Sequence, residues 1–260
     1  MTFDDVLLSL FPNGHHVVEK NHLVFGSGTL PQAGRVAVIG VTGKAAVGVD
    51  EALVLAQHVL DIVHAADAAP CPILVLIDSD SQRMSKRDEL MGLSQFLSHL
   101  AVCLRVADAR GHHTLGLLYG HTAAGAFIAT ALATRTLLAV PGAHPSVMDL
   151  PSMAKVTKLP LAVLEEKARA TPVFAPGLDN LAQTGAIAAV LDPTVSLATQ
   201  IDATLLAGGS SSSVNNTADT SPIAHHDTAD TRDRLGLARG GRPKAADIAQ
   251  RVYDAALALA

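Results

Sequence analysis

The residues with the clearest capacity for chemistry lie in one stretch, Leu115–Val140, LGLLYGHTAAGAFIATALATRTLLAV. The stretch predicts a strand, a tight turn at Gly120–Thr122, a helix of small residues with Gly125 in its first turn, and a second strand. A helix start carries free backbone N–H groups and the positive end of the helix dipole, so it can hold a developing negative charge. The alternative is a crossover helix whose Ala and Gly residues serve only close packing.

A second polar set follows the apolar run Ile73–Ile77, which predicts a central strand of a parallel sheet. The loop Asp78–Met84 comes at its carboxyl end, where open α/β sheets bind ligands. Ser85 begins an S-x-x-D capping signal for a helix that we expect to run to about Ala109. Gly92 lies early in that helix, where glycine costs about 1 kcal/mol relative to alanine. We therefore expect Gly92 to serve close packing or to leave a backbone donor accessible to a ligand.

Other patterns exclude several kinds of chemistry. The loop 42–48 has two glycines and a lysine, but it has the order of neither phosphate-binding motif. The twelve histidines include no H-E-x-x-H or similar ligand pair, so we do not expect a metal site. Ser146 is not within G-x-S-x-G, the nucleophile turn of α/β-hydrolases. Asp78 and Asp80 are two loop carboxylates, which we expect to be solvated.

Composition limits the class of protein. The chain has 260 residues, enough for one large α/β domain or two small ones. Its net charge of -5 argues against nucleic acid and anionic membranes as main partners. No apolar run approaches the roughly 18 residues of a membrane span, and no basic-then-apolar leader is evident. We expect Cys71 and Cys103 to be buried free thiols, which suit a cytoplasmic location.

The order of elements predicts the fold class. Strands and helices alternate at a spacing typical of an α/β protein with a mostly parallel sheet and right-handed crossover helices. We expect a strand at Arg35–Val41 and a helix from Glu51 to about Ala65, capped by Asp50. The first 34 residues predict a short helix, an edge strand and a loop, at Asp4–Phe11, His22–Phe25 and Gly26–Gly28.

The later part of the chain predicts helices that fit a lid or a partner surface. We expect residues 1–207 to form one domain. Residues 208–234 are rich in Ser, Asn and His and predict a flexible linker. Residues 235–260 predict a C-terminal helical segment. The remaining expected elements are four helices and a last strand, at Pro151–Lys158, Leu161–Ala170, Leu178–Thr184, Val195–Leu206 and Ala186–Leu191.

The run from Val36 to Pro176 carries a resemblance to a known family, and four pieces of sequence in it and just beyond it mark the resemblance. They are IDSDSQRMSKRDELMGL (Ile77–Leu93), YGHTAAGAFIATALA (Tyr119–Ala133), AVPGAHPSVMDLPSMAKVTKLPLAVLEE (Ala139–Glu166) and TPVFAPGLDN (Thr171–Asn180). In these pieces the chain resembles the gamma subunit of biotin-independent malonate decarboxylase. The resemblance implies a crotonase/ClpP-like carboxyltransferase fold.

The resemblance also implies an activity and partners. In such an enzyme malonate is carried as a thioester on an acyl carrier subunit, whose prosthetic group is a dephospho-coenzyme A derivative and not biotin. The beta and gamma subunits then release CO2 and leave an acetyl thioester, with the active site between them. The implied partners are the beta subunit, the acyl carrier protein and an acyl carrier transferase. The resemblance assigns no cofactor to this chain itself.

Site residues follow from the resemblance by position. Gly92 and Gly125 match the turns whose backbone N–H groups form oxyanion holes for the enolate. Many carboxyltransferases have a Gly-Gly pair at each place, whereas this chain has Met91-Gly92 and Ala124-Gly125. One glycine of each pair is therefore missing.

Side chains are needed to place the carboxylate and to supply a proton. We expect Gln82 and Ser85 to make polar contacts and His121 and His144 to be candidate proton donors. The alternative for each of the four is a surface or capping residue.

Three other functions stay open from the sequence. One is a non-catalytic scaffold subunit of the same complex. Another is a crotonase-type acyl-CoA hydratase, isomerase or hydrolase that acts alone, although the carboxylate base it needs is not evident. The third is a biotin-dependent carboxyltransferase subunit, although the chain has no biotin-carrying M-K-M sequence.

Overall fold

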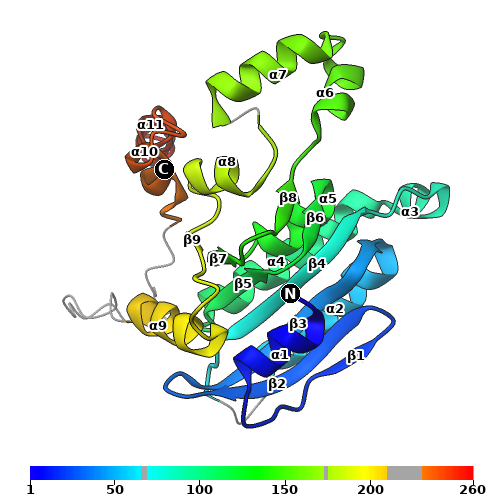
Figure 1. The fold of residues 1–260 in the computed structure, drawn as a ribbon, viewed down its shortest axis with the longest axis vertical. Coiled ribbons are helices and arrows are strands. Elements are labelled where there is room, and N and C mark those ends of the chain that lie inside the picture. Colours follow the sequence, from blue (N-terminus) through cyan, green and yellow to red (C-terminus); the bar gives the residue numbers. More distant parts are fainter. Residues whose placement is uncertain (66–68, 173–174, 210–229, 260) are drawn as a thin grey trace.

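A seven-stranded sheet forms the centre of the computed structural model, which describes residues 1–65, 69–172, 175–209 and 230–259 (Figure 1). The strand order is β1-β2-β3-β4-β5-β7-β9. From β3 onward every neighbouring pair is parallel, which confirms the expected mostly parallel sheet. The strands are β1 (Val18–Lys20), β2 (Leu23–Leu30), β3 (Gly34–Val47), β4 (Ile73–Gln82), β5 (Thr114–Leu118), β7 (Thr136–Ala139) and β9 (Ala189–Val190).

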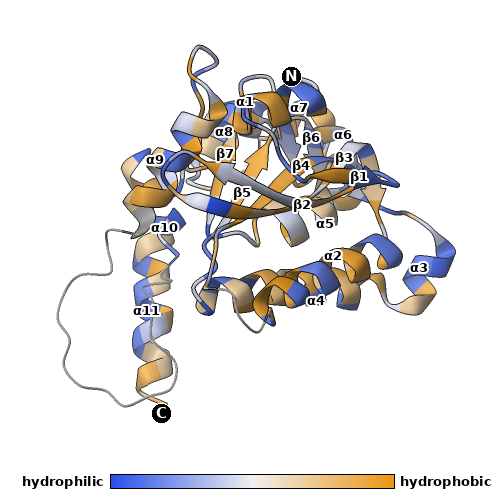
Figure 2. Cartoon of the chain, turned by 90° about the horizontal axis from the view of Figure 1, so that it is seen from below, coloured by the Kyte–Doolittle hydropathy of each residue, from blue (hydrophilic) through white to orange (hydrophobic). Residues whose placement is uncertain are grey.

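Helices cover both faces of this sheet. Helices α2 (Val49–Val63) and α4 (Leu93–Ala109) pack side by side on one face, and α1 (Phe3–Leu10) and α9 (Leu197–Gly209) cover the other (Figures 1 and 2). Residues Ile73–Ile77 of β4 are all buried. A strand covered on both faces has no polar side, which explains its unbroken apolar run.

Short elements continue beyond the carboxyl ends of β4 and β5. A two-stranded parallel sheet joins β6 (His121–Ala123) to β8 (His144–Ser146). Helix α5 (Ala124–Ala126) follows β6 and runs into a π-helical turn at Phe127–Ala131. The expected strand, turn, helix and strand are confirmed, and the turn contains the additional strand β6. Turns of π-helix are frequent at functional sites.

Several helices project from the layered body (Figure 1). Helix α3 (Lys86–Met91) extends from the end of β4, and α6 (Leu150–Thr157) and α7 (Leu161–Ala170) form a helical pair that follows β8. Helix α8 (Leu178–Gln183) then leads back to β9. Helices α6, α7 and α8 lie where the sequence predicted them, with boundaries shifted by one residue at most.

The C-terminal segment is attached to the body through α10 (Arg232–Ala238). Arg239 donates to the carbonyl oxygens of Ala182, Ile187 and Ala188. Helix α11 (Ala245–Leu257) has no buried residue and points away from the body in Figure 2. Most of the expected linker, residues 210–229, lies outside the described residues.

Three expectations about loops are wrong, because strand pairing extends further than apolar patterning suggests. The expected loop 42–48 is the second half of β3, which pairs with β4 across register shifts. The polar loop after Ile77 continues β4 as far as Gln82. Gly26–Gly28 lie inside β2, where an added Cβ at Gly28 would meet the Phe11 ring at 2.4 Å.

Two expectations about helices also need correction. The N-cap of α2 is Gly48 and not Asp50, because the Glu51 carboxylate accepts from the Gly48 N–H at 2.8 Å. The single helix expected up to Ala109 is divided into α3 and α4 by Gly92, which has a φ of +86°. Glycine adopts this left-handed conformation without a Cβ penalty, and this accounts for its place in a helical pattern.

Candidate active site

Gly125 and Gln82 meet at the carboxyl edge of the sheet. The Gly125 N–H donates to Oε1 of Gln82 at 2.8 Å. Gly125 lies in the first turn of α5, where N–H groups have no partner within the helix. The side-chain oxygen of Gln82 therefore marks a position at which this backbone N–H can donate to a carbonyl oxygen.

Close packing surrounds this donor. A Cβ added to Gly125 would lie 3.1 Å from Cδ1 of Leu97 and 3.2 Å from Oε1 of Gln82. The preceding residue, Ala124, has a φ of +49°, a conformation that glycine adopts with less strain. Residues held in such conformations cost about 1–3 kcal/mol each and cluster at functional sites.

Gly92 lies at the junction of α3 and α4. Its N–H donates to the carbonyl oxygens of Asp88 and Glu89, so the last turn of α3 uses this donor. Leu97, which an added Cβ at Gly125 would touch, lies five residues further along α4. The start of α4 and the start of α5 therefore lie on the same side of the sheet edge. The assignment of Gly92 to an oxyanion hole stays a prediction.

The two candidate proton donors, His121 and His144, are register partners in the β6–β8 sheet. Nδ1 of His121 lies 3.0 Å from the carbonyl oxygen of Ser79. Because a carbonyl oxygen only accepts, Nδ1 carries the hydrogen, and Nε2 is left for other contacts. His144 is exposed, and among the described residues its ring has no hydrogen bond.

Ser85 has the role of a cap. Its Oγ accepts from the Asp88 N–H at 3.0 Å at the start of α3, as the S-x-x-D signal predicts. The side chain is thus engaged in local structure, and a direct contact with substrate stays a prediction.

Sequence reasoning missed the role of Asp78. Its Oδ1 accepts from the His121 N–H at 2.9 Å, and its Oδ2 accepts from the Lys44 N–H at 3.1 Å. A Cβ added to Gly120 would lie 2.2 Å from Oδ1 of Asp78. Asp78 therefore ties β3, β4 and β6 together and is not a simply solvated carboxylate. The glycine just before His121 is the sequence signal for this close approach.

Tyr119 is a further buried polar group near this edge. Its hydroxyl donates to Oγ1 of Thr42 at 2.7 Å. Burial strongly raises the pKa of the Tyr119 phenol, so the hydroxyl stays neutral and acts as a structural donor.

The part of the chain that the structure describes bears on the expectations about metal ions, membrane spans and cysteines. No group of three or more His, Cys, Asp or Glu side chains there could hold a metal ion. No helix in the same residues has the length and apolar character to cross a membrane. Cys71 and Cys103 are both free and buried, as expected.

A mostly parallel sheet, with a backbone donor at a glycine-containing helix start, places the chain in the class of α/β proteins that can bind ligands at the carboxyl edge of the sheet. Within this class the chain belongs to the malonate decarboxylase gamma subunit family, whose family model matches residues 42–256. This match confirms the family that the four sequence pieces indicated.

Solved structures share the fold. A chain of the Pseudomonas malonate decarboxylase hetero-tetramer in complex with coenzyme A has a TM-score of 0.72 and 21% identity, covering 96% of this chain and 97% of that chain. A chain of the Pseudomonas MdcD-MdcE hetero-dimer has a TM-score of 0.67 at 21% identity, over 90% of this chain and 94% of that chain. Transcarboxylase 12S with hydrolyzed methylmalonyl-coenzyme A bound has a TM-score of 0.65 at 14% identity, over 86% of this chain and 42% of that chain.

One curated relative matches over a shorter part of the chain. Malonyl-S-ACP:biotin-protein carboxyltransferase of Malonomonas rubra is 29% identical over 119 residues, which are 45% of this chain and 41% of the relative. The match thus spans about two fifths of the length of that protein.

Proposed function

We propose that this chain is the gamma subunit of a malonate decarboxylase that releases CO2 from a malonyl thioester. The observation that carries the proposal is the Gly125 N–H, which is held at the start of α5 and donates to a carbonyl oxygen at 2.8 Å. In the reaction the thioester oxygen takes the place of Oε1 of Gln82. Family membership supports the same activity.

The chemistry requires a site for negative charge and a proton. When the bond between the α-carbon and the carboxylate breaks, its electron pair forms an enolate with charge on the thioester oxygen. A backbone donor at that oxygen is worth about 10²–10³ in rate. A proton then adds to the α-carbon and gives the acetyl thioester. His121 and His144 are the candidate donors that this chain offers.

Gln82 has a second task once the thioester oxygen is bound. Its amide is then free to donate through Nε2 to the malonyl carboxylate. This contact fixes the carboxylate relative to the thioester plane, which favours release of CO2 in the correct orientation.

The proposed complex contains three further subunits. The beta subunit completes the active site, the acyl carrier protein brings the thioester on a dephospho-coenzyme A type group, and the acyl carrier transferase loads that group. Two solved structures with this fold are of a hetero-tetramer and a hetero-dimer, which supports a beta-type partner. We place the complex in the cytoplasm, in keeping with two free cysteines.

A second candidate function is carboxyl transfer to biotin. The name of the Malonomonas relative, a biotin-protein carboxyltransferase, supports it. In that reaction the same enolate forms, but the carboxyl group passes to biotin on another protein and is not released as CO2.

The test is CO2 release by the complex that co-purifies with the tagged chain, with a malonyl thioester as substrate and avidin present to block biotin. Gly125→Val places a branched side chain where the Cβ alone is already 3.1 Å from Leu97. Gly34→Asn is the control, because its Cβ would meet nothing within 4 Å and asparagine tolerates the positive φ of +72° at this position. Complex integrity is checked by gel filtration.

Release that is insensitive to avidin, and lost in an intact Gly125→Val complex but kept in Gly34→Asn, supports the decarboxylase. We expect the loss to be about 10²-fold or larger. Release that survives Gly125→Val in an intact complex supports the scaffold role. Transfer of the carboxyl group to a biotin protein in place of CO2 release, blocked by avidin, supports the biotin-dependent reaction.

A further inference from the structure

Asp88 is a buried carboxylate whose contacts reach outside its own helix. Its side chain is 1% exposed, although α3 projects from the body. Its carboxylate does not return to the Ser85 N–H as in a capping box, because that N–H donates to the carbonyl oxygen of Arg83. Instead Oδ2 accepts from the Val49 N–H at 3.3 Å, and Oδ1 accepts from Nη1 of Arg87 at 3.0 Å.

Arg83 connects this carboxylate to the start of α2. Its guanidinium pairs with Glu51 and lies 3.9 Å from Oδ2 of Asp88. Its backbone N–H donates to the carbonyl oxygen of Val47 at 2.9 Å. Glu51 in turn accepts from the Gly48 N–H. The ends of β3 and β4 and the starts of α2 and α3 are therefore joined through charged side chains.

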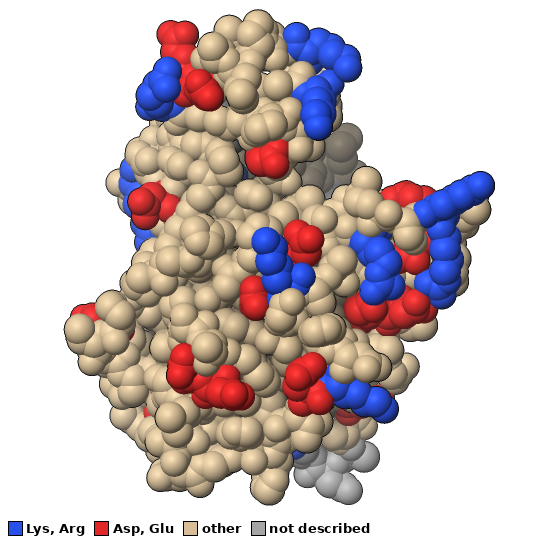
Figure 3. Space-filling view, turned by 45° about the vertical axis from the view of Figure 1, so that its right-hand side comes forward, with Lys and Arg blue, Asp and Glu red and all other residues tan. Residues whose placement is uncertain are grey.

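We call Glu51, Arg83, Arg87 and Asp88 the Asp88 cluster. The cluster packs directly against backbone, because a Cβ added to Gly48 would lie 2.3 Å from Oδ2 of Asp88. Figure 3 shows the charged side chains gathered at the projection that α3 forms, whereas most of the same view is uncharged. Removing one partner of a buried ion pair costs about 3–5 kcal/mol, so the geometry of such a cluster is strongly enforced.

Both sides of the candidate active site are tied to this cluster. Gln82 immediately precedes Arg83 in the chain and pairs in register with Val47. The backbone carbonyl of Asp88 accepts from the Gly92 N–H, at the junction that starts α4.

We infer that Asp88 is a positioning residue, which sets Gln82 against the Gly125 N–H and fixes the start of α4. This inference rests on the proposed function for its kinetic consequence. Asp88 does not touch the thioester. It acts by holding the backbone of Gln82, whose side chain is the partner of the Gly125 N–H. Loss of the Asp88 carboxylate therefore changes the rate of decarboxylation more than the affinity for substrate.

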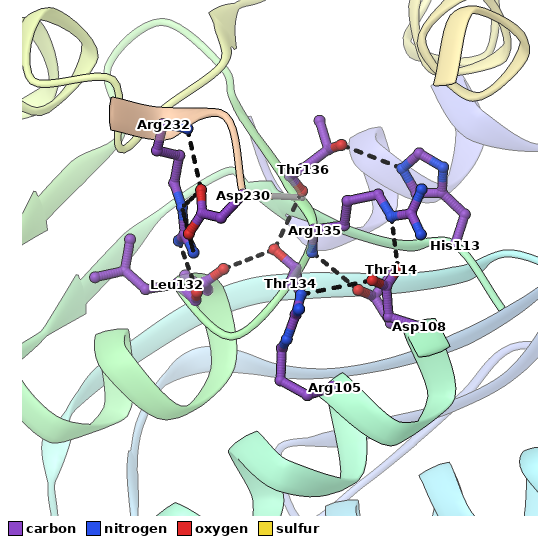
Figure 4. Close-up of polar contacts among 11 residues, drawn as sticks. Arg105, Asp108, His113, Thr114, Leu132, Thr134, Arg135, Thr136, Asp230 and Arg232 are labelled. Carbon is purple, nitrogen blue, oxygen red and sulfur yellow. Dashed lines mark hydrogen bonds and ion pairs between the residues drawn. The ribbon is translucent and has the colours of Figure 1, made fainter. Parts of the chain in front are cut away.

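The opposite edge of the sheet provides a matched control. Asp108 is also completely buried and is also paired with two arginines, Arg105 at 3.5 Å and Arg135 at 2.7 Å (Figure 4). It lies at the end of α4 near the amino ends of β5 and β7, away from Gln82 and Gly125. Asp108→Asn therefore removes the same charge in a similar setting without reaching the site.

The experiment compares Asp88→Asn, Asp108→Asn, Gln82→Ala and the double variant Asp88→Asn/Gln82→Ala in the assembled complex. We measure kcat and KM for CO2 release, the thermal midpoint, and amide hydrogen exchange in peptides covering residues 80–92 and 120–127. The exchange measurement needs no turnover, so it reports on positioning even in a complex that fails to release CO2.

We expect Asp88→Asn to lower kcat about tenfold with little change in KM, since a misplacement near 1 Å can cost up to 10²-fold. Asp108→Asn should lower the thermal midpoint as much and leave kcat within about twofold. In the Gln82→Ala background the further effect of Asp88→Asn should fall below about twofold, because both act on one contact. Exchange at both peptides should rise in Asp88→Asn alone.

The inference is overturned if Asp88→Asn lowers only the thermal midpoint. It is equally overturned if the loss of kcat in the double variant equals the product of the losses in Asp88→Asn and Gln82→Ala. It is also overturned if exchange at residues 120–127 matches that of Asp108→Asn. A wild-type complex that releases no CO2 contradicts the proposed function, and the exchange result then decides the positioning role by itself.

Discussion

Two buried carboxylates, Asp88 and Asp108, lie at opposite edges of the same sheet. Each is 1% exposed or less, and each is paired with two arginines. At the carboxyl edge, Arg83 and Arg87 are 37% and 54% exposed and stand on a projecting segment. At the amino edge, Arg105 and Arg135 are 46% and 20% exposed. The same combination of charges thus occurs at both edges, and the edges differ in the polar groups that surround it.

The amino edge is closed because its polar groups bind one another (Figure 4). The Arg135 N–H donates to Oγ1 of Thr114 at 2.9 Å, and Nε2 of His113 lies 3.1 Å from Oγ1 of Thr136. These contacts join the starts of β5 and β7. At the carboxyl edge, by contrast, the partner of the Gly125 N–H among the described residues is the side chain of Gln82, which a ligand can displace. The carboxyl edge is therefore the one where a bound ligand can replace a contact within the protein.

The largest expected effect at the closed edge follows from Asp108→Ala. This change removes the buried carboxylate that pairs with Arg135. We therefore expect the free energy of unfolding to fall by about 3–5 kcal/mol. Urea denaturation of the purified chain measures it. Asp50→Ala is the control, because Asp50 is 58% exposed and its pair with Arg87 should contribute less than about 1 kcal/mol. Equal losses in the two variants would remove the distinction between the edges.

A pH dependence should also come from the closed edge. Burial, with Arg135 nearby, lowers the pKa of His113 to about 4. Between about pH 6.5 and pH 4 the unfolded chain therefore binds more protons than the folded one, and the free energy of unfolding falls as pH falls. Allowing for partial exposure, the loss should be about 2–3 kcal/mol over this window.

The variant His113→Gln tests this pH dependence. We compare urea denaturation of wild type and variant at several pH values across the same window. The free energy of unfolding should change more steeply with pH in the wild type than in His113→Gln. Above about pH 7 the two slopes should become equal. Parallel slopes would show that His113 does not titrate differently in the two states.

The smallest expected effect concerns the open edge. Ser85→Ala removes the acceptor for the Asp88 N–H and should cost α3 about 1 kcal/mol. Amide exchange in α3 should rise with little change in the global midpoint, because the side-chain contacts of Asp88 that join α3 to α2 stay intact. Thr2→Ala, which removes the N-cap bond to Asp5 in α1, is the matched control. A larger global loss for Ser85→Ala would show that the cap, and not only Asp88, holds α3 to the body.

Local patterns predicted much of this edge. The apolar run Ile73–Ile77 predicts a central strand in an α/β protein. The S-x-x-D signal at Ser85 predicts a helix cap, which depends on contacts within four residues. Gly125 was expected at a helix start and lies in the first turn of α5. The break at Gly92 was not foreseen, because a glycine in a helical pattern does not by itself show whether its φ is positive.

Contacts between distant segments could not be read from local patterns. The extension of β3 through residues 42–47 depends on pairing with β4, more than 30 residues away. The polar residues there do not alternate with apolar ones, so periodicity gave no strand signal. The roles of Asp78 and Asp88 likewise depend on backbone N–H groups contributed by other elements.

The sequence by itself determined the α/β class, the central strands, the helix starts that carry Gly125 and Ser85, and the family. These features depend on periodicity, capping and long ordered motifs. Only the tertiary structure decided that Gln82 accepts from Gly125, that His121 and His144 are register partners, and that Asp88 is buried between three elements. The physical reason is that hydrogen bonds and burial depend on which distant segments become neighbours, and no local pattern specifies that.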